Sequence, residues 1–275
     1  VLALTAEGRS NQAIGERLEL QPGDEIAWYS RGMSLYHLGR YEDAIASFDH
    51  ALHLKPDQLN SWYNHGNALS LLERYEEAVT SHNIALDLKP DYLKAWYSRG
   101  NALSNLGRYE DAIVSYDKAL EIFPELDLAW FNKGLAFVSL DCYEEAIASY
   151  DKVIDLFPAY FPAHLNRGIV LSKLGRHEDA IASYDAVLAI KSADPDAWYN
   201  RGIALFNLER YEEAIANYNK ALALAPGFYE AWYNHATTLL KLDRNEEAIA
   251  SYDKVLEINP TFYEAWYGRG FALLN

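Results

Sequence analysis

Tryptophan recurs every 34 residues along this chain of 275 residues, with one exception. A proline column keeps the same period and runs six residues ahead of it, also with one exception. A fixed period held along the chain without an insertion indicates stacked copies of one small unit, not a single globular core. We therefore expect function on a long surface instead of in one catalytic cleft. The tryptophan column is Trp28, Trp62, Trp96, Trp130, Trp198, Trp232 and Trp266, with His164 in the gap, and the proline column is Pro22, Pro56, Pro90, Pro124, Pro158, Pro226 and Pro260, with Ser192 in the gap.

Composition limits the kind of partner. Half of the residues are apolar, which is ample for a continuous core between stacked helices. The formal net charge is -16, from 40 acidic and 24 basic residues. Such a charge repels phosphate backbones and anionic lipid, so binding to nucleic acid or to a membrane surface is not expected. We expect a protein or peptide partner that is neutral to basic.

The single cysteine, Cys142, excludes an internal disulfide framework and a cysteine-rich metal site. No apolar run approaches the ~18 residues of a membrane span, and no basic-then-apolar signal sequence opens the chain. These features favour a cytoplasmic location. The chain begins at Val1 and ends at Asn275 partway through a unit, which suggests a piece of a longer protein.

Residues 93–126 illustrate the repeating unit. Trp96, Leu103 and Leu106 have helical spacing, and Gly107 is a stop signal of the kind found just after a helix. A second helix is predicted from Tyr109, with acidic residues in its first turn and an apolar stripe that ends before Pro124. Two helices of about 12 residues joined by a short turn form a helical hairpin.

Small residues recur at two columns of the unit and predict close helix packing. Glycine within a helix costs about 0.5–1 kcal/mol relative to alanine, so its repetition indicates a tight helix crossing. The glycine column of the first helix is Gly32, Gly66, Gly100, Gly134, Gly168, Gly202 and Gly270, with Ala236 in its place once, and the alanine column of the second helix is Ala44, Ala78, Ala112, Ala146, Ala180, Ala214 and Ala248.

This order of tryptophan, glycine, large apolar residue, alanine, aromatic and proline resembles the tetratricopeptide repeat, and in particular the regular arrays of bacterial and cyanobacterial proteins. The resemblance covers essentially the whole chain. It implies an all-α, right-handed superhelical solenoid of antiparallel helix pairs, with the first helices lining a concave groove. Residues 1–24 are expected to form an irregular second helix of a partial repeat, and residues 263–275 the first helix of a truncated eighth repeat. Seven full repeats are predicted at 25–58, 59–92, 93–126, 127–160, 161–194, 195–228 and 229–262.

No catalytic, cofactor or metal motif is found in the sequence. The paired acidic residues occur at every second-helix start, where stabilisation of the helix dipole explains them. His50 and His53 lie one turn apart, but no third strong ligand has suitable spacing, so they are interpreted as surface histidines. We therefore predict no enzymatic activity, no cofactor and no metal.

The columns that follow each tryptophan are the candidate binding surface. In related arrays, notably those of O-linked N-acetylglucosamine transferases, an asparagine ladder at this place binds an extended peptide backbone. Asparagine offers both a donor and an acceptor, so it reads a peptide group irrespective of side chain. Ser30 and Ser98 depart from the ladder. The predicted groove residues are Asn64, Asn132, Asn166, Asn200 and Asn234 of the ladder, with Tyr29, Tyr63, Tyr97, Phe131, Tyr199 and Tyr233 beside it. The alternative is that these residues are only tolerated at wet helical positions.

A second family function, capture of a chaperone's C-terminal carboxylate, is not expected. It needs a clamp of lysine, asparagine and arginine. Asn67 and Asn101 fit part of that pattern and are included among the groove residues, but the places that need basic residues hold tyrosine.

A basic column just before the glycine departs from the leucine usual in the family. It lies opposite an acidic column within each hairpin, which predicts ion pairs that hold the hairpin in register, although desolvation opposes their net stabilisation. The alternative is a basic stripe that attracts acidic ligands. The predicted pairs are Arg31 with Asp49, Arg99 with Asp117, Lys133 with Asp151, and Arg167 with Asp185.

The sequence as a whole predicts a non-catalytic interaction module that holds an extended partner segment in its groove. Three alternatives stay open: a regulatory or targeting domain of a larger signalling enzyme, an assembly scaffold that binds folded partners on its convex side, and end-to-end self-association through exposed ends. The irregular junction at 158–165 is a local bend or a special contact.

Overall fold

The structure is a computed structural model that describes residues 23–274. The irregular helix predicted within residues 1–24 therefore lies outside the described residues, except for Gly23 and Asp24. The described residues are almost entirely helical and contain no strand. They divide into two compact units, of which the first ends at Leu140 and the second begins at Asp141.

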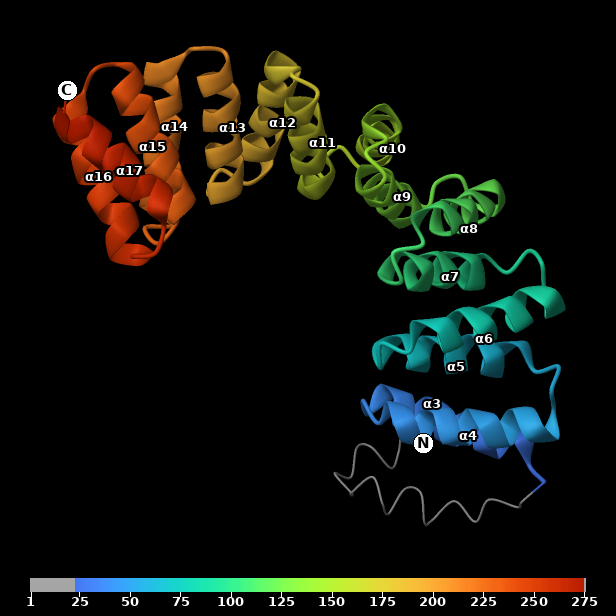
Figure 1. Ribbon diagram of the computed structural model, residues 1–275. Coiled ribbons are helices and arrows are strands. Elements are labelled where there is room, and N and C mark those ends of the chain that lie inside the picture. Colours follow the sequence, from blue (N-terminus) through green and yellow to red (C-terminus); the bar gives the residue numbers. More distant parts are fainter. Residues whose placement is uncertain (1–22, 275) are drawn as a thin grey trace. The chain divides into compact units, whose positions relative to one another are not determined.

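From Gly23 onwards, the first unit holds seven helices, coloured blue to green in Figure 1. From the first to the last of these helices, each one packs against the next within the unit, and the first helices of successive repeats in the unit also touch. "First helix" and "second helix" are used here for the two members of each predicted repeat. The helices of this unit are α3 (Glu25–His37), α4 (Tyr41–Leu54), α5 (Leu59–Leu71), α6 (Tyr75–Leu88), α7 (Leu93–Asn105), α8 (Tyr109–Ile122) and α9 (Asp127–Ser139).

The second unit repeats the same pattern of neighbours. Its last helix lies within residues 263–275, where the sequence predicts a lone first helix. The helices are α10 (Tyr143–Leu156), α11 (Phe161–Lys173), α12 (His177–Ile190), α13 (Pro195–Asn207), α14 (Tyr211–Leu224), α15 (Tyr229–Lys241), α16 (Asn245–Ile258) and α17 (Tyr263–Leu274).

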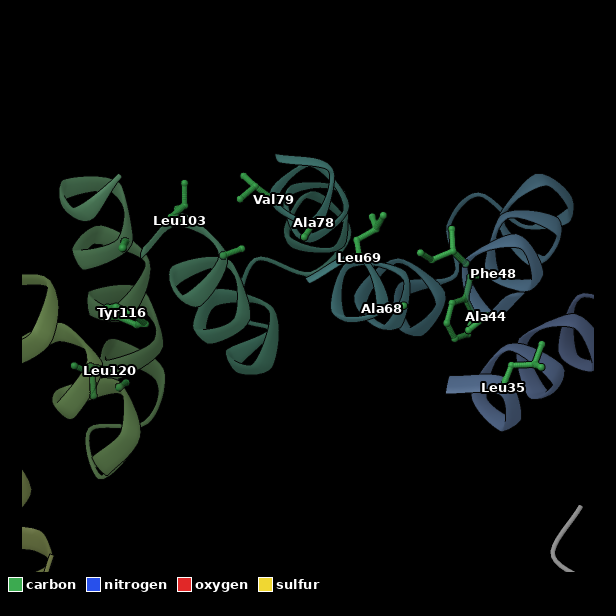
Figure 2. Packing of buried hydrophobic residues seen from close by; sticks show 14 residues of the cluster. Leu35, Ala44, Phe48, Ala68, Leu69, Ala78, Val79, Leu103, Tyr116 and Leu120 are labelled. Atoms are coloured by element: carbon green, nitrogen blue, oxygen red, sulfur yellow. The ribbon is translucent and has the colours of Figure 1, made fainter. Parts of the chain in front are cut away.

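The core is a continuous ladder of small and large residues from successive helices. Ala44 and Phe48 of α4, Ala68 and Leu69 of α5, and Ala78 of α6 are all buried and follow one another along the first unit (Figure 2). The alanine column is completely buried, because only a methyl group fits where two helices cross this closely.

The glycine column sets the distance between the two helices of a repeat. A Cβ atom added to Gly100 would lie 2.5 Å from the ring of Tyr116 on the paired second helix, and the same holds at Gly32 with the ring of Phe48. The tight helix crossing that the glycines predict is thus confirmed. The aromatic ring of the second helix occupies the space that a side chain would need.

The turn between the two helices places one residue in the left-handed region. In the repeat of α7 and α8, Gly107 has a φ of 74°, and the Arg108 amide donates to the Leu103 carbonyl at 2.9 Å. This is the Schellman arrangement, which pairs carbonyls that the helix end leaves free. Some repeats have glycine at this position, and others have glutamate or aspartate. The positive-φ residues are Gly39, Glu73, Gly107, Asp141, Gly175, Glu209 and Asp243.

The tryptophan and proline columns are linked by a hydrogen bond. The indole Nε1 of Trp62 donates to the carbonyl of Pro56 at 2.8 Å, so the start of one first helix is tied to the loop after the preceding second helix. His164 makes the same contact: its Nε2 lies 2.9 Å from the carbonyl oxygen of Pro158. The missing tryptophan therefore preserves the contact with a different ring. The same bond joins Trp96 to Pro90, Trp130 to Pro124, Trp198 to Ser192, Trp232 to Pro226 and Trp266 to Pro260.

His82 occupies the buried aromatic column of the second helices. It has no solvent exposure, and within residues 23–274 neither ring nitrogen has a hydrogen-bond partner. Burial lowers the pKa of His82 to about 4, and the nearby positive charge of Arg99 acts in the same direction. The imidazole therefore stays neutral in the core.

Substitution of Gly100 by alanine should destabilise the protein. The added methyl group forces the Tyr116 ring to shift, and overpacking of this kind costs typically ~1–3 kcal/mol. Because the chain itself places Ala236 in this column, we expect about 1 kcal/mol in the free energy of unfolding, measured by urea denaturation. Gly270→Ala is the matched control, since nothing lies within 4 Å of its added Cβ atom. A gain of stability in both variants would contradict the packing role.

His82→Phe should make the protein more resistant to acid. Burial lowers the pKa of His82 from the ordinary histidine value of 6.5 to about 4, so its contribution to the free energy of unfolding is complete above pH 6.5 and is lost as the pH falls towards 4. The free energy of unfolding that His82 loses on acidification is on the order of 3 kcal/mol. Urea denaturation at a series of pH values measures it, with the exposed His53→Gln as control. An unchanged pH dependence in His82→Phe would contradict this assignment.

Candidate functional site

The candidate binding surface is the first-helix face, defined by the five columns of each first helix that begin with the aromatic residue after the tryptophan. After the first two columns, the third stands one helical turn on and the last two stand two turns on, so all five lie on the same side of the helix. All of its residues in the first unit are half-buried or exposed. They are Tyr29, Ser30, Met33, Tyr36 and His37 on α3; Tyr63, Asn64, Asn67, Ser70 and Leu71 on α5; Tyr97, Ser98, Asn101, Ser104 and Asn105 on α7; and Phe131, Asn132, Leu135, Val138 and Ser139 on α9.

Three of the predicted ladder asparagines tie neighbouring repeats together. The side-chain nitrogen of Asn132 donates to the hydroxyl of Tyr97 in the preceding repeat at 3.1 Å. Asn64 donates in the same way to Tyr29 at 3.1 Å, and Asn234 to Tyr199 at 3.0 Å. The amide nitrogens of these three residues thus already donate within the protein, which the sequence does not reveal.

The other two ladder residues bond within their own helices. Asn200 donates to the carbonyl of Asp196 at 2.8 Å, and Asn166 donates to that of Pro162 at 2.8 Å. For Asn200 the reason is direct, since the preceding repeat has Leu165 in place of tyrosine and therefore no hydroxyl.

The tyrosine column that follows the tryptophans is half-buried and does not simply face outward. The ring of Tyr97 packs against the buried ring of Tyr116 at 6.2 Å, and that of Tyr199 against Tyr218 at 6.1 Å. Phe131 and the other members of the column, Tyr29, Tyr63 and Tyr233, are likewise half-buried. Burial raises the pKa of Tyr199 to about 12, with Glu230 adding to the effect, so its hydroxyl is a neutral hydrogen-bonding group at physiological pH.

Cavities on the first-helix face collect the asparagines. One of 310 Å³ is lined by Asn101, Ser104, Asn105, Tyr116, Asn132 and Leu135, between α7, α8 and α9. Next to it, a cavity of 170 Å³ is lined by Tyr36, Asn67, Ser70, Leu71, Ser98 and Asn101. In the second unit, a cavity of 230 Å³ is lined by Ile203, Phe206, Asn207, Tyr218, Asn234 and Thr237. Four of the predicted groove residues, Asn67, Asn101, Asn132 and Asn234, therefore line cavities.

Sequence reasoning missed the residues further along each first helix. Ser104 and Asn105 line the largest cavity described above, one turn beyond Asn101. Helical spacing of three and four residues from the asparagine column would have found them. It would equally have found Phe206 and Asn207 in the second unit.

The first-helix face of the first unit is uncharged. At its five columns on α3, α5, α7 and α9 there is no aspartate, glutamate, lysine or arginine. The acidic residues at the second-helix starts carry much of the charge of -16 instead. Many of these pair locally with the arginine before the helix, as Arg74 does with Glu77 at 2.6 Å. The candidate surface thus differs from the rest of this acidic chain.

The basic column connects adjacent repeats and does not pair within the hairpin, so the ion-pair prediction is wrong in its partners. Arg167 Nε lies 2.6 Å from Asp151 of the preceding repeat, and Arg201 Nε lies 2.8 Å from Asp185. Lys133 pairs likewise with Asp117. The predicted partners Asp49, Asp117 and Asp185 instead face the following repeat, where Asp49 contacts His65.

The reason is the direction in which each aspartate points from the second helix. Two residues before each predicted aspartate stands a residue that turns towards its own first helix: Arg167 Nη1 donates to Ser183 at 2.7 Å, and Arg99 to Ser115 at 2.6 Å. Two helical positions differ by about 200°, so Asp185 points the other way.

Arg99 and Lys133 of the basic column also lie over the rings of Trp96 and Trp130. Arg31 bonds Ser47 and lies over Trp28. Since these cations are engaged in such contacts, the alternative of a basic stripe for acidic ligands is not supported.

Comparisons with known proteins agree on the repeat. The tetratricopeptide repeat model matches residues 26–58, 93–126 and 195–228, and a TPR repeat model matches residues 66–107, 134–175, 170–209 and 236–275, which is more than half of the chain. The chain belongs to the tetratricopeptide repeat family. The predicted family and the predicted all-α helical repeat solenoid are therefore confirmed. Tetratricopeptide repeats generally act as non-catalytic protein-interaction modules. No curated protein matches the sequence.

Solved tetratricopeptide repeat proteins share this fold. YrrB, described as a TPR protein with an unusual peptide-binding site, is 24% identical over 67% of this chain and 95% of its own, with a TM-score of 0.60. MamA from Desulfovibrio magneticus, from residue 41 to its end, is 25% identical over 62% of this chain and 96% of its own, with a TM-score of 0.59. The C-terminal part of a TPR protein from Cytophaga hutchinsonii is 18% identical over 87% of this chain and 98% of its own, with a TM-score of 0.78.

Three further observations concern other parts of this tetratricopeptide array. Within residues 23–274 no cluster of histidine, cysteine or acidic residues could hold a metal ion, and no helix is long and apolar enough to cross a membrane. His50 stacks on Trp28 with ring centroids 4.3 Å apart. The last helix, α17, exposes a row of large apolar residues, and end-to-end self-association through it stays a prediction. Those residues are Tyr263, Trp266, Tyr267, Phe271, Leu273 and Leu274.

A double-mutant cycle distinguishes the two pairings of Arg167. We expect a coupling of about 0.5–1 kcal/mol between Arg167→Met and Asp151→Asn, because the pair is half-buried and joins two repeats. The cycle of Arg167→Met with Asp185→Asn should give a coupling near zero, although both residues lie in one repeat. The free energies of unfolding come from urea denaturation. A larger coupling to Asp185 would restore the within-hairpin pairing.

Proposed function

We propose that this tetratricopeptide array is a non-catalytic module that binds an extended, uncharged segment of a partner protein along its first-helix face. The observation that carries the proposal is the combination of an uncharged surface with adjacent cavities lined by asparagine and serine. An extended peptide leaves its N–H and C=O groups free, and side-chain amides can meet both.

The charge distribution favours a neutral segment over a basic one. The paired acidic residues that would attract a basic partner stand in the first turns of the second helices and not in the five columns of the first-helix face. A lysine or arginine of the partner would meet no carboxylate from these columns in the first unit. The net charge of -16 can still attract an approaching basic protein at long range. This attraction does not supply carboxylate contacts at the five columns.

A peptide-binding site on a related fold adds to this proposal. YrrB is described as having an unusual peptide-binding site.

The scaffold alternative predicts a different surface. Folded partners bound on the second-helix side would contact exposed residues such as Val114 of α8 and Thr80 of α6. Because Thr80 and Val114 stand on second helices, whereas the five columns stand on first helices, substitutions on the two surfaces separate the proposals.

Selection of peptides from a phage-displayed library of random dodecapeptides tests the proposal. We expect enriched peptides with few charges, and the double variant Asn67→Ala with Asn101→Ala should weaken their binding by about tenfold or more, measured by fluorescence polarisation. The matched control is Thr80→Ala with Val114→Ala on the second helices, which should leave affinity unchanged. Circular dichroism melts verify that both variants are folded. Peptides whose affinity depends on the second-helix pair alone would overturn the proposal in favour of the scaffold.

A further inference from the structure

The cavity between α7 and α9 contains a fixed network of hydrogen bonds. The Oδ1 atom of Asn101 accepts from the Tyr116 hydroxyl at 2.9 Å and from the Nδ2 of Asn132 at 3.0 Å. Asn132 Nδ2 also donates to Tyr97 at 3.1 Å, so both of its hydrogens are used. These bonds set the orientation of both amide groups, because each amide can satisfy its partners in one way only.

The same network leaves one donor group and one acceptor atom without a hydrogen-bond partner among the described residues. Within residues 23–274, no partner is found for the Nδ2 of Asn101 or for the Oδ1 of Asn132, although both residues line the cavity. Asn105 donates to the Asn101 carbonyl at 2.9 Å, which leaves its own Oδ1 as a second acceptor. The cavity therefore offers a donor and acceptors from side chains that are already held in place.

The cavity lining excludes other types of side chain. None of the lining residues carries a charge, so a charged side chain would lose hydration without gaining a partner. An aliphatic side chain would leave the amide groups of Asn101 and Asn132 unsatisfied, which costs free energy. A primary carboxamide supplies both a donor and an acceptor. At 310 Å³ the cavity far exceeds the volume of one water, about 30 Å³, and can hold a side chain.

We propose that the cavity of Asn101 and Asn132 binds the carboxamide side chain of a glutamine or asparagine in the partner segment. The proposal rests on the proposed function, since it names a side chain of the segment bound to the first-helix face. Asn101 Nδ2 donates to the carboxamide oxygen, and Asn132 Oδ1 accepts from the carboxamide nitrogen. The buried Tyr116, whose pKa burial raises to about 12, keeps its proton and holds Asn101 in orientation.

The second unit contains a natural counterpart of this cavity. The six residues that line the cavity of 230 Å³ stand at the same places of their repeats as those of the first. Asn101 is replaced there by Ile203 and Ser104 by Phe206, while Asn132 has its equivalent in Asn234. This cavity has lost the free donor of Asn101 and has gained apolar surface, so it should prefer an aliphatic side chain. It provides an internal control within one protein.

Amino-acid derivatives test the proposal by NMR on the whole chain. N-acetyl-glutamine methylamide should shift the side-chain amide signals of Asn101 and Asn132 saturably, and N-acetyl-glutamate methylamide should bind at least about tenfold more weakly. N-acetyl-leucine methylamide should instead shift the signals of Asn234 and Thr237. The variant Asn101→Ile, which copies Ile203, should lose the glutamine response while its other backbone signals stay in place.

N-acetyl-alanine methylamide separates this proposal from the proposed function, because it has two peptide groups and no carboxamide side chain. If it shifts Asn101 and Asn132 as strongly as the glutamine derivative, the face binds backbone and the carboxamide cavity is refuted. Equal binding of the leucine or glutamate derivative at Asn101 and Asn132 also refutes it. If none of the derivatives shifts these signals, the carboxamide proposal falls, whereas peptides from the library selection can still support the proposed function.

Discussion

The close approach of an aromatic ring to a glycine backbone is the interaction on which the rest of this structure depends. In the repeat of α7 and α8, the ring of Tyr116 lies where a side chain of residue 100 would be. The contact presses the glycine side of the first helix onto the second helix, so the helix has one rotational setting only. This setting fixes the directions in which the residues of the tryptophan, basic and asparagine columns point, because each stands at a constant spacing from the glycine on the same helix. The position of the candidate binding surface is therefore a consequence of packing.

Much of the fold was predictable, because its signals are local and repeated. The glycine and alanine columns correctly predicted tight crossings, and Gly107 correctly marked a helix end. The contacts between repeats were harder. Arg167 was assigned to Asp185 because both belong to one hairpin, whereas it pairs with Asp151. A repeating sequence gives the same residue types at each interval, so the pattern cannot tell a partner within a repeat from the same residue one repeat earlier. Only the rotation of Ser183 towards the first helix decides it.

The candidate site was predictable in its location but not in its hydrogen bonding. The sequence identified the asparagine column, yet half of what Asn132 can donate or accept is used inside the protein, on Tyr97 and Asn101. These bonds give the same residue two tasks, because an amide held by neighbouring repeats is also an amide whose free oxygen has a fixed direction. A ligand meeting such a group does not have to order it, which reduces the entropy lost on binding.

The residue type at the left-handed turn position affects how the repeats of the array unfold locally. Residues with a Cβ atom in the left-handed region cost roughly 1–2 kcal/mol relative to glycine. Glu73 and Glu209 therefore strain two turns, while Gly39, Gly107 and Gly175 relax theirs. In a linear array each repeat is stabilised by its neighbours alone, so local differences are not averaged over a common core. Exchange of amide hydrogens with solvent should thus be uneven along the chain, with the hairpins that turn at glutamate opening before those that turn at glycine.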